Sequence, residues 1–186
     1  MSKSVDSAKK SQLGRRDVII RAAIRVIADE GIAATTHRKI AKEAKVPLGS
    51  VTYYFKNLDE LFFAAFSLFA EEGSIAYAKG LEAATSVEEA REAVVRIITG
   101  TKPDQKTMGI VYELYAYSTR NPVFQTLMQD WMKRSRKALS RHFDPSTSKL
   151  LDALVEGAII HNSVAVARIS VGEVRKAVQL LTEHQK

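Results

Sequence analysis

The amino-acid sequence predicts an all-α protein of about nine helices. Apolar residues recur at intervals of three and four along most of the chain, which places them on one face of a helix. No stretch of alternating apolar and polar residues predicts a strand, and no internal repeat competes with the helical pattern. Prolines, glycines and capping residues divide the pattern into a small N-terminal module and a longer C-terminal helical bundle.

The N-terminal part begins with polar and basic residues at positions 1–14, which are predicted to form a disordered arm. The apolar positions that follow predict three helices separated by two breaks. Gly31 ends the first helix, because glycine readily adopts the left-handed conformation found after many helices. Lys45-Val46-Pro47 ends the second, since proline disfavours helix in the residue before it. The predicted helices span residues 15–30, 36–44 (capped by Thr35 or Thr36) and 48–55.

Longer helices are predicted after residue 57. Asn57 and Glu60 have the spacing of a capping box, and so do Ser86 and Glu89. Asp144-Pro145 supplies a cap followed by a proline at the first helical position. The predicted helices span about residues 58–79, 86–100, 107–119, 123–143, 146–169 and 171–183, with a loop at 101–106.

The composition excludes several classes of protein. The chain has 186 residues and no cysteine, which rules out disulfides and thiolate metal sites. Its four histidines show no metal-ligand spacing, and no nucleophile, phosphate-loop or zinc-protease motif is present. We therefore expect no enzyme activity, no cofactor and no metal. The N-terminus has no signal-peptide pattern and no window predicts a membrane span, so a cytoplasmic protein without membrane contact is expected.

The net charge of +7 lies entirely at one end of the chain. Residues 1–56 contain 12 Lys and Arg against five Asp and Glu, whereas the remainder contains 16 of each. Many of these cations lie in the predicted helices: Arg15, Arg16, Arg21, Arg25, Arg38, Lys39, Lys42 and Lys45. A basic surface confined to one module predicts binding to a polyanion such as DNA, and plain solvation of the helices is the alternative.

The segment from Thr36 to Phe55 has the pattern of a helix-turn-helix. Ala41 is a small residue where the second helix must cross closely, and Val51, ten residues later, is placed to face the core. A short turn joins the two helices. The second would present its N-terminal end to the major groove, with Pro47, Leu48, Gly49 and Ser50, followed by Thr52, Tyr53 and Tyr54.

This module resembles the DNA-binding domain of the TetR (TetR/AcrR) family of transcription regulators. The resemblance rests on Gly31, on Thr35-Thr-His-Arg-Lys-Ile-Ala41, on Gly49-Ser-Val-Thr-Tyr-Tyr-Phe55 and on the start of the next helix at Lys56-Asn-Leu-Asp-Glu-Leu61. It covers residues 15–61, with the motif at 36–55. It implies DNA contacts from Thr36, His37, Arg38, Leu48, Gly49, Ser50, Thr52, Tyr53, Tyr54 and Lys56.

Three residues depart from the family pattern. Lys45 replaces the usual turn glycine, so a left-handed conformation there would cost on the order of 1 kcal/mol. Thr52 replaces a tyrosine, which leaves more of the contact to Tyr53. Leu58 replaces a phosphate-binding lysine, for which Lys56 is the expected substitute. Two predicted contacts have alternatives: Tyr54 as a packing residue on the first helix, and a solvated His37.

Residues 62–186 are predicted to form a helical domain for ligand sensing and dimerisation. Its aromatic and methionine residues fit either a bundle core or an apolar pocket with a few polar groups. The predicted ligand-binding residues are Phe66, Met108, Tyr112, Tyr115, Met128, Trp131, His161 and Asn162. For His161 and Asn162 an interface or solvated edge is the alternative. Glu113 and Glu156 are candidates to neutralise a cationic ligand, with solvent exposure as the alternative.

The helix predicted at residues 146–169 is apolar on more than one face and has small residues at Gly157, Ala158, Ala165 and Ala167. With the last helix it would form half of a four-helix dimer interface, as the resemblance implies. The expected protein is a homodimer on a palindromic operator, most simply a repressor released by a small organic effector. The alternatives are an activator or partner-controlled regulator without a small effector, and a general nucleoid-binding protein.

Overall fold

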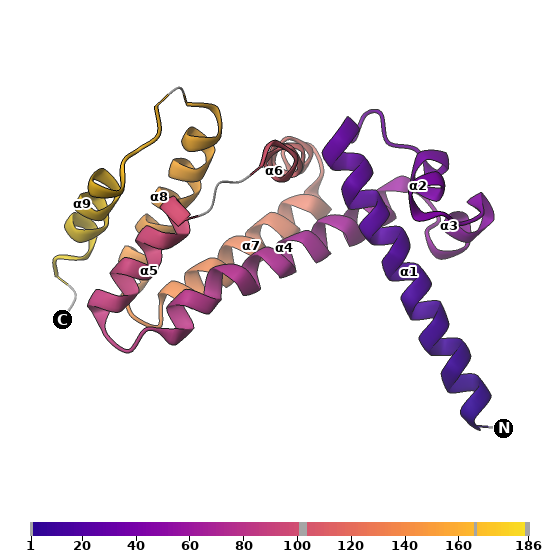
Figure 1. The fold of residues 1–186 in the computed structure, drawn as a ribbon, viewed down its shortest axis with the longest axis horizontal. Coiled ribbons are helices and arrows are strands. Elements are labelled where there is room, and N and C mark those ends of the chain that lie inside the picture. The colour runs from indigo at the N-terminus through magenta and orange to yellow at the C-terminus, as the bar shows by residue number, and fades with distance from the viewer. Residues whose placement is uncertain (1, 101–103, 166, 185–186) are drawn as a thin grey trace. The chain divides into compact units, whose positions relative to one another are not determined.

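The computed structural model describes residues 2–100, 104–165 and 167–184, with side chains from residue 14 onward. Over these residues it consists of nine helices and no strand, which confirms the predicted fold class (Figure 1). The three residues 101–103 of the predicted 101–106 loop lie outside the described ranges. The helices are α1 (Ser2–Glu30), α2 (His37–Ala44), α3 (Leu48–Tyr54), α4 (Leu58–Ala83), α5 (Val87–Gly100), α6 (Gln105–Ser118), α7 (Pro122–Leu139), α8 (Pro145–Val164) and α9 (Val171–Thr182).

The chain folds into two compact units. The first contains Met1–Phe69 and the Gly109–Tyr117 segment of α6, and the second contains Ala70–Met108 and Ser118–Lys186. Helices α4 and α6 therefore contribute residues to both. The first unit is larger than the domain predicted at residues 15–61, because the first turns of α4 and most of α6 pack with α1 to α3.

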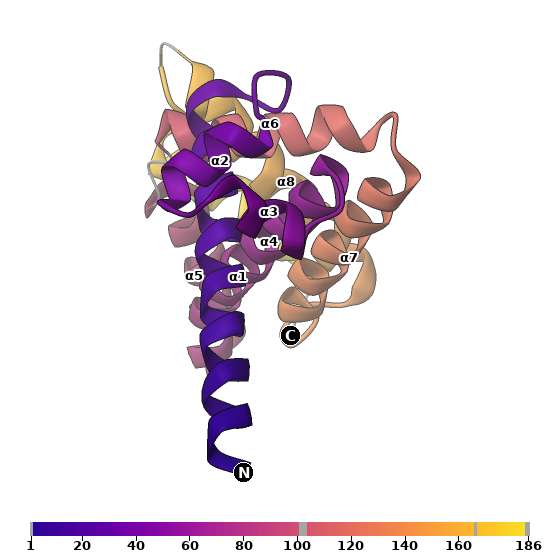
Figure 2. The same ribbon diagram turned by 90° about the vertical axis from the view of Figure 1, so that its right-hand side faces the viewer.

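The core of the first unit forms where α2 and α3 pack against the C-terminal half of α1. Ala41, the small residue predicted at the helix crossing, is 4% exposed, and Val51 and Phe55 of the recognition-helix segment are fully buried. The apolar face of α1 is also buried as predicted, except that Val18 is exposed. Figures 1 and 2 show the N-terminal turns of α1 extending beyond α2 and α3.

Helix α1 begins at Ser2 and not at Arg15. The predicted disordered arm at residues 1–14 is therefore wrong for residues 2–14, and Met1 lies outside the described residues. The physical reason is that positions 2–13 contain neither proline nor glycine. Once the packed part of α1 has formed, extending the helix costs far less than nucleating it.

Helix α4 begins directly after Asn57, the first residue of the predicted capping box. The Glu60 N–H donates to Asn57 Oδ1, and the Glu60 carboxylate accepts from the Lys56 N–H. By length and composition α4 is also the one helix among the described residues that could cross a membrane, which the sequence analysis did not predict. Core helices of globular proteins pass the same test, and Phe62, Ala65 and Ala70 of α4 are buried.

The core of the second unit joins the end of α4 to α5, α7, α8 and α9. It is built from fully buried aliphatic residues and one phenylalanine, among them Leu81, Val94, Leu139, Phe143, Leu151, Val155, Val174 and Val178. Polar links surround it. His142 Nε2 lies 2.8 Å from the Leu81 carbonyl oxygen, and Arg175 of α9 forms a two-pronged ion pair with Glu92 of α5.

Helix α8 ends at Val164, five residues earlier than predicted. Ala165 is extended (φ −73°, ψ 143°), and the Asn162 side-chain oxygen accepts a hydrogen bond from the Ile169 N–H at 2.9 Å. Asn162 thereby folds the connection to α9 back onto the end of α8. Ala165 and Ala167, predicted as small residues of this helix, lie instead in the exposed connection.

Candidate nucleic-acid interface and effector residues

The turn between α2 and α3 is held by Lys45 in the left-handed conformation. Its φ of 54° and ψ of 43° confirm the conformation predicted for this position. The Lys45 N–H donates to Lys42, and the Val46 N–H donates 3.0 Å to the Ala41 carbonyl, which satisfies the end of α2. Among the described non-glycine residues Lys45 alone has a positive φ, so the strain of the module is concentrated in this turn.

The recognition helix α3 separates its inward and outward residues cleanly. Val51 and Phe55 are buried, whereas Tyr53 is 71% exposed and Leu48 is 43% exposed. Gly49 and Thr52 are exposed, and Ser50 and Tyr54 are half-buried. Tyr54 lies edge-on to Tyr53, with 5.1 Å between the ring centroids. The outward face predicted to enter the groove is therefore accessible.

The N-terminal half of α1 adds two arginines to this surface that the predicted site did not include. Arg15, Gly49, Ser50, Tyr53 and Tyr54 line an open recess of about 310 Å³. The Arg16 guanidinium lies over the Phe55 ring, 5.0 Å from its centroid. The pair Arg15-Arg16 at the start of the apolar periodicity was the available signal, but only the packing of α1 on α3 shows which face it occupies.

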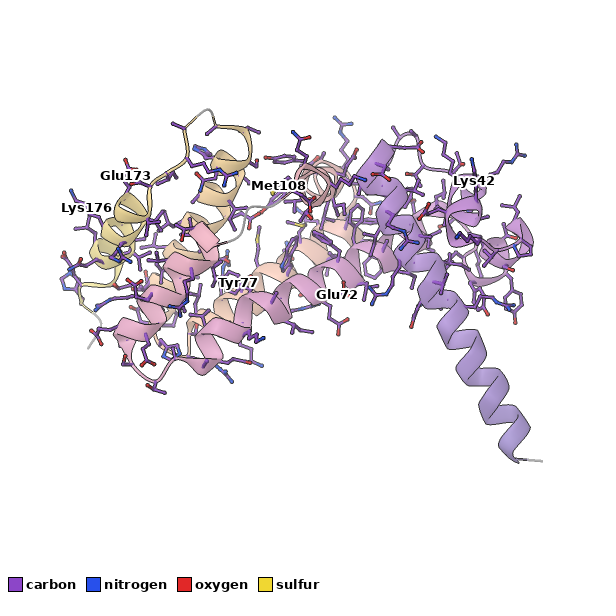
Figure 3. All side chains as sticks on the ribbon, viewed as in Figure 1. Lys42, Glu72, Tyr77, Met108, Glu173 and Lys176 are labelled. Atoms are coloured by element: carbon purple, nitrogen blue, oxygen red, sulfur yellow. The ribbon has the colours of Figure 1, made fainter. Side chains whose placement is uncertain are left out.

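Besides the cations of α1 that precede Arg25, the cations of the module fall into two groups. Arg25 forms an ion pair with Glu43, and Lys39 with Glu30, so these four charges cancel in pairs. The other group consists of exposed residues for which the described structure shows no ion pair: Arg38, Lys42, Lys45 and Lys56. Lys42 lies on the outer side of α2, away from α1 (Figure 3). Positive charge without an ion pair among the described residues thus lies on α2, the turn and the start of α4, beside Arg15 of α1.

The first residues of α2 differ in how they could meet DNA. Thr36 is exposed, and its hydroxyl oxygen caps α2 by accepting from the Lys39 N–H at 3.2 Å. Arg38 is exposed. His37 is half-buried, and its Nε2 is buried with no hydrogen-bond partner in the described part of the chain, so that nitrogen does not face solvent. Of the predicted contacts at this end, Arg38 and the Thr36 hydroxyl have the clearest access.

The predicted effector residues are divided between the two units. Phe66, Tyr112 and Tyr115 belong to the first, and Met108, Met128, Trp131, His161 and Asn162 to the second, so a common pocket stays a prediction. Phe66, Met108 and Met128 are buried. His161 is exposed, and the Asn162 side-chain oxygen accepts a hydrogen bond from the Ile169 N–H in the loop after α8. These observations favour the alternative that the two residues lie at a solvated edge or an interface. The described residues contain no group of side chains that could hold a metal ion.

Tyr77 on α4 is a polar residue of the second unit that the sequence analysis did not single out. Its hydroxyl is buried and has no hydrogen-bond partner among the residues that the structure describes. Burial, and then the negative charges of Asp152 and Glu156 on α8, raise the pKa of Tyr77 well above its ordinary value. Asp152 itself pairs with Arg136 at 2.9 Å. A buried phenol without a partner is costly, and its position could only be found from the packing of α4.

The chain is similar to known transcription regulators. Residues 19–65 match the family model described as bacterial regulatory proteins, tetR family. The chain is 37% identical to SCO7518, a candidate transcriptional regulator of Streptomyces coelicolor A3(2), with a TM-score of 0.83 over 90% of this chain and 98% of that one. It is 30% identical to the multidrug binding protein EbrR, solved in complex with ethidium, with a TM-score of 0.76 over 90% and 98%.

A third relative is the nicotine-responsive transcriptional repressor HdnoR of Paenarthrobacter nicotinovorans. It is 28% identical over 134 residues, which cover 69% of each chain. The chain belongs to the TetR family of DNA-binding transcription regulators. The family match includes α2, α3 and the turn at Lys45, so the resemblance predicted from residues 15–61 is confirmed.

Proposed function

We propose that this protein is a cytoplasmic homodimeric repressor that binds a palindromic operator and leaves it when a small organic ligand binds the C-terminal domain. The observation on which the DNA-binding surface rests is the exposed face of α3 beside four unpaired cations. Exposed tyrosine, serine and threonine side chains can contact phosphates and thymine methyl groups, and the cations neutralise the phosphate backbone. Arg15 extends the proposed contact surface onto α1.

The dimer interface is proposed on α8 and α9. Leu150, Leu154, Gly157, His161 and Val164 follow each other on α8 at spacings of four and three, which places them in one stripe. Leu150 is 52% exposed and Val164 is 74% exposed. Leu180 and Val171 of α9 are exposed as well. Apolar side chains that lie on one face of a helix and are exposed in a single chain are expected to be covered in the assembly.

The effector is proposed to be an aromatic or alkaloid-like organic molecule. EbrR binds ethidium and HdnoR responds to nicotine, and this chain is similar to both. Within its own second unit, the unpartnered Tyr77 hydroxyl is a polar group that a bound ligand would satisfy. The ligand must favour the conformer whose recognition helices do not match the operator half-sites.

The decisive experiment is to select bound fragments from the genome that encodes the protein and to footprint them. A repressor of this kind protects a discrete palindrome, and reporter expression from that promoter rises when the gene is deleted. Protection without a discrete site would indicate a nucleoid-binding protein. A fall in expression on deletion would indicate an activator. Sedimentation of the full chain and of a variant that carries Leu150→Glu and Leu180→Glu tests the interface, because charges at these exposed positions are expected to give a folded monomer.

The effector is tested on the isolated promoter fragment and on the protein alone. Nicotine is titrated into the protein–DNA complex, whereas ethidium is titrated into protein without DNA because it intercalates. Saturable binding of either that is altered at least severalfold by Tyr77→Phe would support an effector site at α4. Binding that Tyr77→Phe leaves unchanged would remove Tyr77 from the site.

A further inference from the structure

A recess in the first unit lies where α6 crosses the C-terminal end of α1. It has a volume of about 400 Å³ and is lined by Ile27, Ala28, Gly31, Gly109, Tyr112, Glu113 and Ala116. All seven residues belong to the first compact unit. Apart from Glu113 and the Tyr112 ring, the wall consists of aliphatic side chains, glycines and backbone. The recess is therefore a largely apolar surface with one charged side chain, Glu113.

Two glycines allow α6 to bring a carboxylate against the end of α1. Gly31 has a φ of +78°, and a Cβ at this position would lie only 2.5 Å from Glu113 Oε1. Gly109, on α6, faces the Ala28 carbonyl oxygen, which would lie 3.9 Å from a Cβ there. Any side chain at residue 31 would displace the Glu113 carboxylate, so this approach depends on glycine.

The charge of Glu113 is uncompensated where it stands. Its carboxylate has no hydrogen-bond or ion-pair partner among the described residues, and no lysine or arginine lines the recess. It lies at the C-terminal end of the 29-residue helix α1, where the helix dipole is negative. The Gly31 N–H bonds to Ile27, and no backbone N–H in the described structure reaches the Ala28 carbonyl. The Glu113 carboxylate, the C-terminal end of α1 and the Ala28 carbonyl oxygen therefore all attract positive charge.

We propose that this recess binds an organic cation, whose ammonium or amidinium group lies between the Glu113 carboxylate and the Ala28 carbonyl. The apolar part of the ligand would pack on Ile27 and Ala116, and the Tyr112 ring, 36% exposed, would cover it as a cation–π partner. A metal ion is disfavoured, since calcium and magnesium require several oxygen ligands and Glu113 is the only carboxylate in the wall.

The site is placed to influence the DNA-binding module. The Thr35 hydroxyl donates 2.7 Å to the Gly31 carbonyl, so the segment that leads into α2 is fixed to the same helix end that the cation would contact. A bound cation would hold the Gly109–Tyr117 segment of α6 to α1. This consequence rests on the proposed regulator function, whereas cation binding itself does not.

The test uses benzamidine, an aromatic amidinium, as the probe and neutral benzamide as its matched control. Binding to the full-length protein is measured by calorimetry without DNA. Benzamidine is expected to bind saturably and benzamide at least about tenfold more weakly, because only the amidinium forms an ion pair with the carboxylate and can donate two parallel hydrogen bonds to it. Glu113→Gln is expected to lower the affinity for benzamidine by about tenfold or more, with no loss of thermal stability.

Two further variants make the result specific. Glu71→Gln removes the same charge from an exposed position on α4 and should leave the affinity unchanged. Gly109→Ala should weaken binding by restricting access to the Ala28 carbonyl, while its Cβ meets only an ordinary contact. Equal binding of benzamidine and benzamide, equal loss in both glutamate variants, or no saturable binding would each overturn the proposal. Because no DNA is present, such a result would leave the regulator function intact.

Discussion

Replacing Tyr53 with alanine removes the most exposed aromatic side chain of α3. The ring is 71% exposed, and its recorded ring contact is the edge-on packing with Tyr54 at 5.1 Å. An edge-on aromatic pair contributes about 0.5–1.5 kcal/mol, and exposed positions otherwise change stability by about 0.5 kcal/mol or less. The free energy of unfolding should therefore fall by only about 1 kcal/mol.

The effect on operator affinity should be larger. A lost contact to a phosphate or a thymine methyl group costs about 1–3 kcal/mol, and a symmetric dimer loses it in both half-sites. Even the lower value, doubled to about 2 kcal/mol, corresponds to roughly 30-fold weaker binding. Tyr53→Phe is the matched control, because it keeps the ring and removes only the hydroxyl. A Phe variant with wild-type affinity would assign the contact to the ring.

The assay is fluorescence anisotropy on the operator fragment at fixed salt, with thermal melting of each variant in parallel. Unchanged affinity in Tyr53→Ala would show that the outward face of α3 does not contact the operator. A collapse of the melting transition would show that Tyr53 is a structural residue despite its exposure. Either outcome would refute the geometric reasoning based on Val51 and Phe55.

The remaining predictions concern charge, backbone strain and pH. Four cations of each protomer are proposed to contact phosphates: Arg38, Lys42, Lys45 and Lys56. A plot of the logarithm of the binding constant against the logarithm of the salt concentration should then have a slope of about −7. A slope near zero would exclude these contacts. Lys45→Gly should raise the free energy of unfolding, measured by urea titration, by about 1 kcal/mol, because glycine adopts a positive φ without cost. An unchanged free energy of unfolding would mean that the turn is unstrained. Tyr117 donates a hydrogen bond to Asp59, and this bond, burial and the negative charge of Asp59 raise its pKa from 10.0 to about 12. The folded state then retains the phenol proton that the unfolded state loses, so stability should fall as the pH rises above 10, and less steeply in Tyr117→Phe.

Most of the DNA-binding module could be predicted from the sequence because its signals are local. Ala41, Val51 and Phe55 occupy positions set by helical periodicity and by the length of one turn, and all are buried. The left-handed conformation of Lys45 was expected only from the family resemblance, because the family usually has a glycine at this turn position. The capping residues at Asn57 and Ser86 likewise depend on near neighbours in sequence.

The features that were missed depend on contacts between distant residues. The end of α8 is set by the hydrogen bond that the Ile169 N–H donates to the Asn162 side-chain oxygen, which competes with a helical pattern that continues to residue 169. The unpartnered hydroxyl of Tyr77 and the approach of Glu113 to Gly31 arise from the packing of separate helices. Neither a tyrosine among small residues nor a glutamate in an amphipathic helix signals such an arrangement.

At Lys45 the backbone strain of the turn and the charge beside the DNA-binding helix favour different residues. Glycine would suit the backbone of this turn better, whereas lysine places a positive charge between α2 and α3. No single-nucleotide change converts a lysine codon into a glycine codon, and the intermediates encode arginine or glutamate. Arginine keeps both the strain and the charge, and glutamate keeps the strain and reverses the charge. On the path from lysine to glycine, the first mutational step therefore brings either no relief of the backbone strain in the turn or a reversal of the charge at this position.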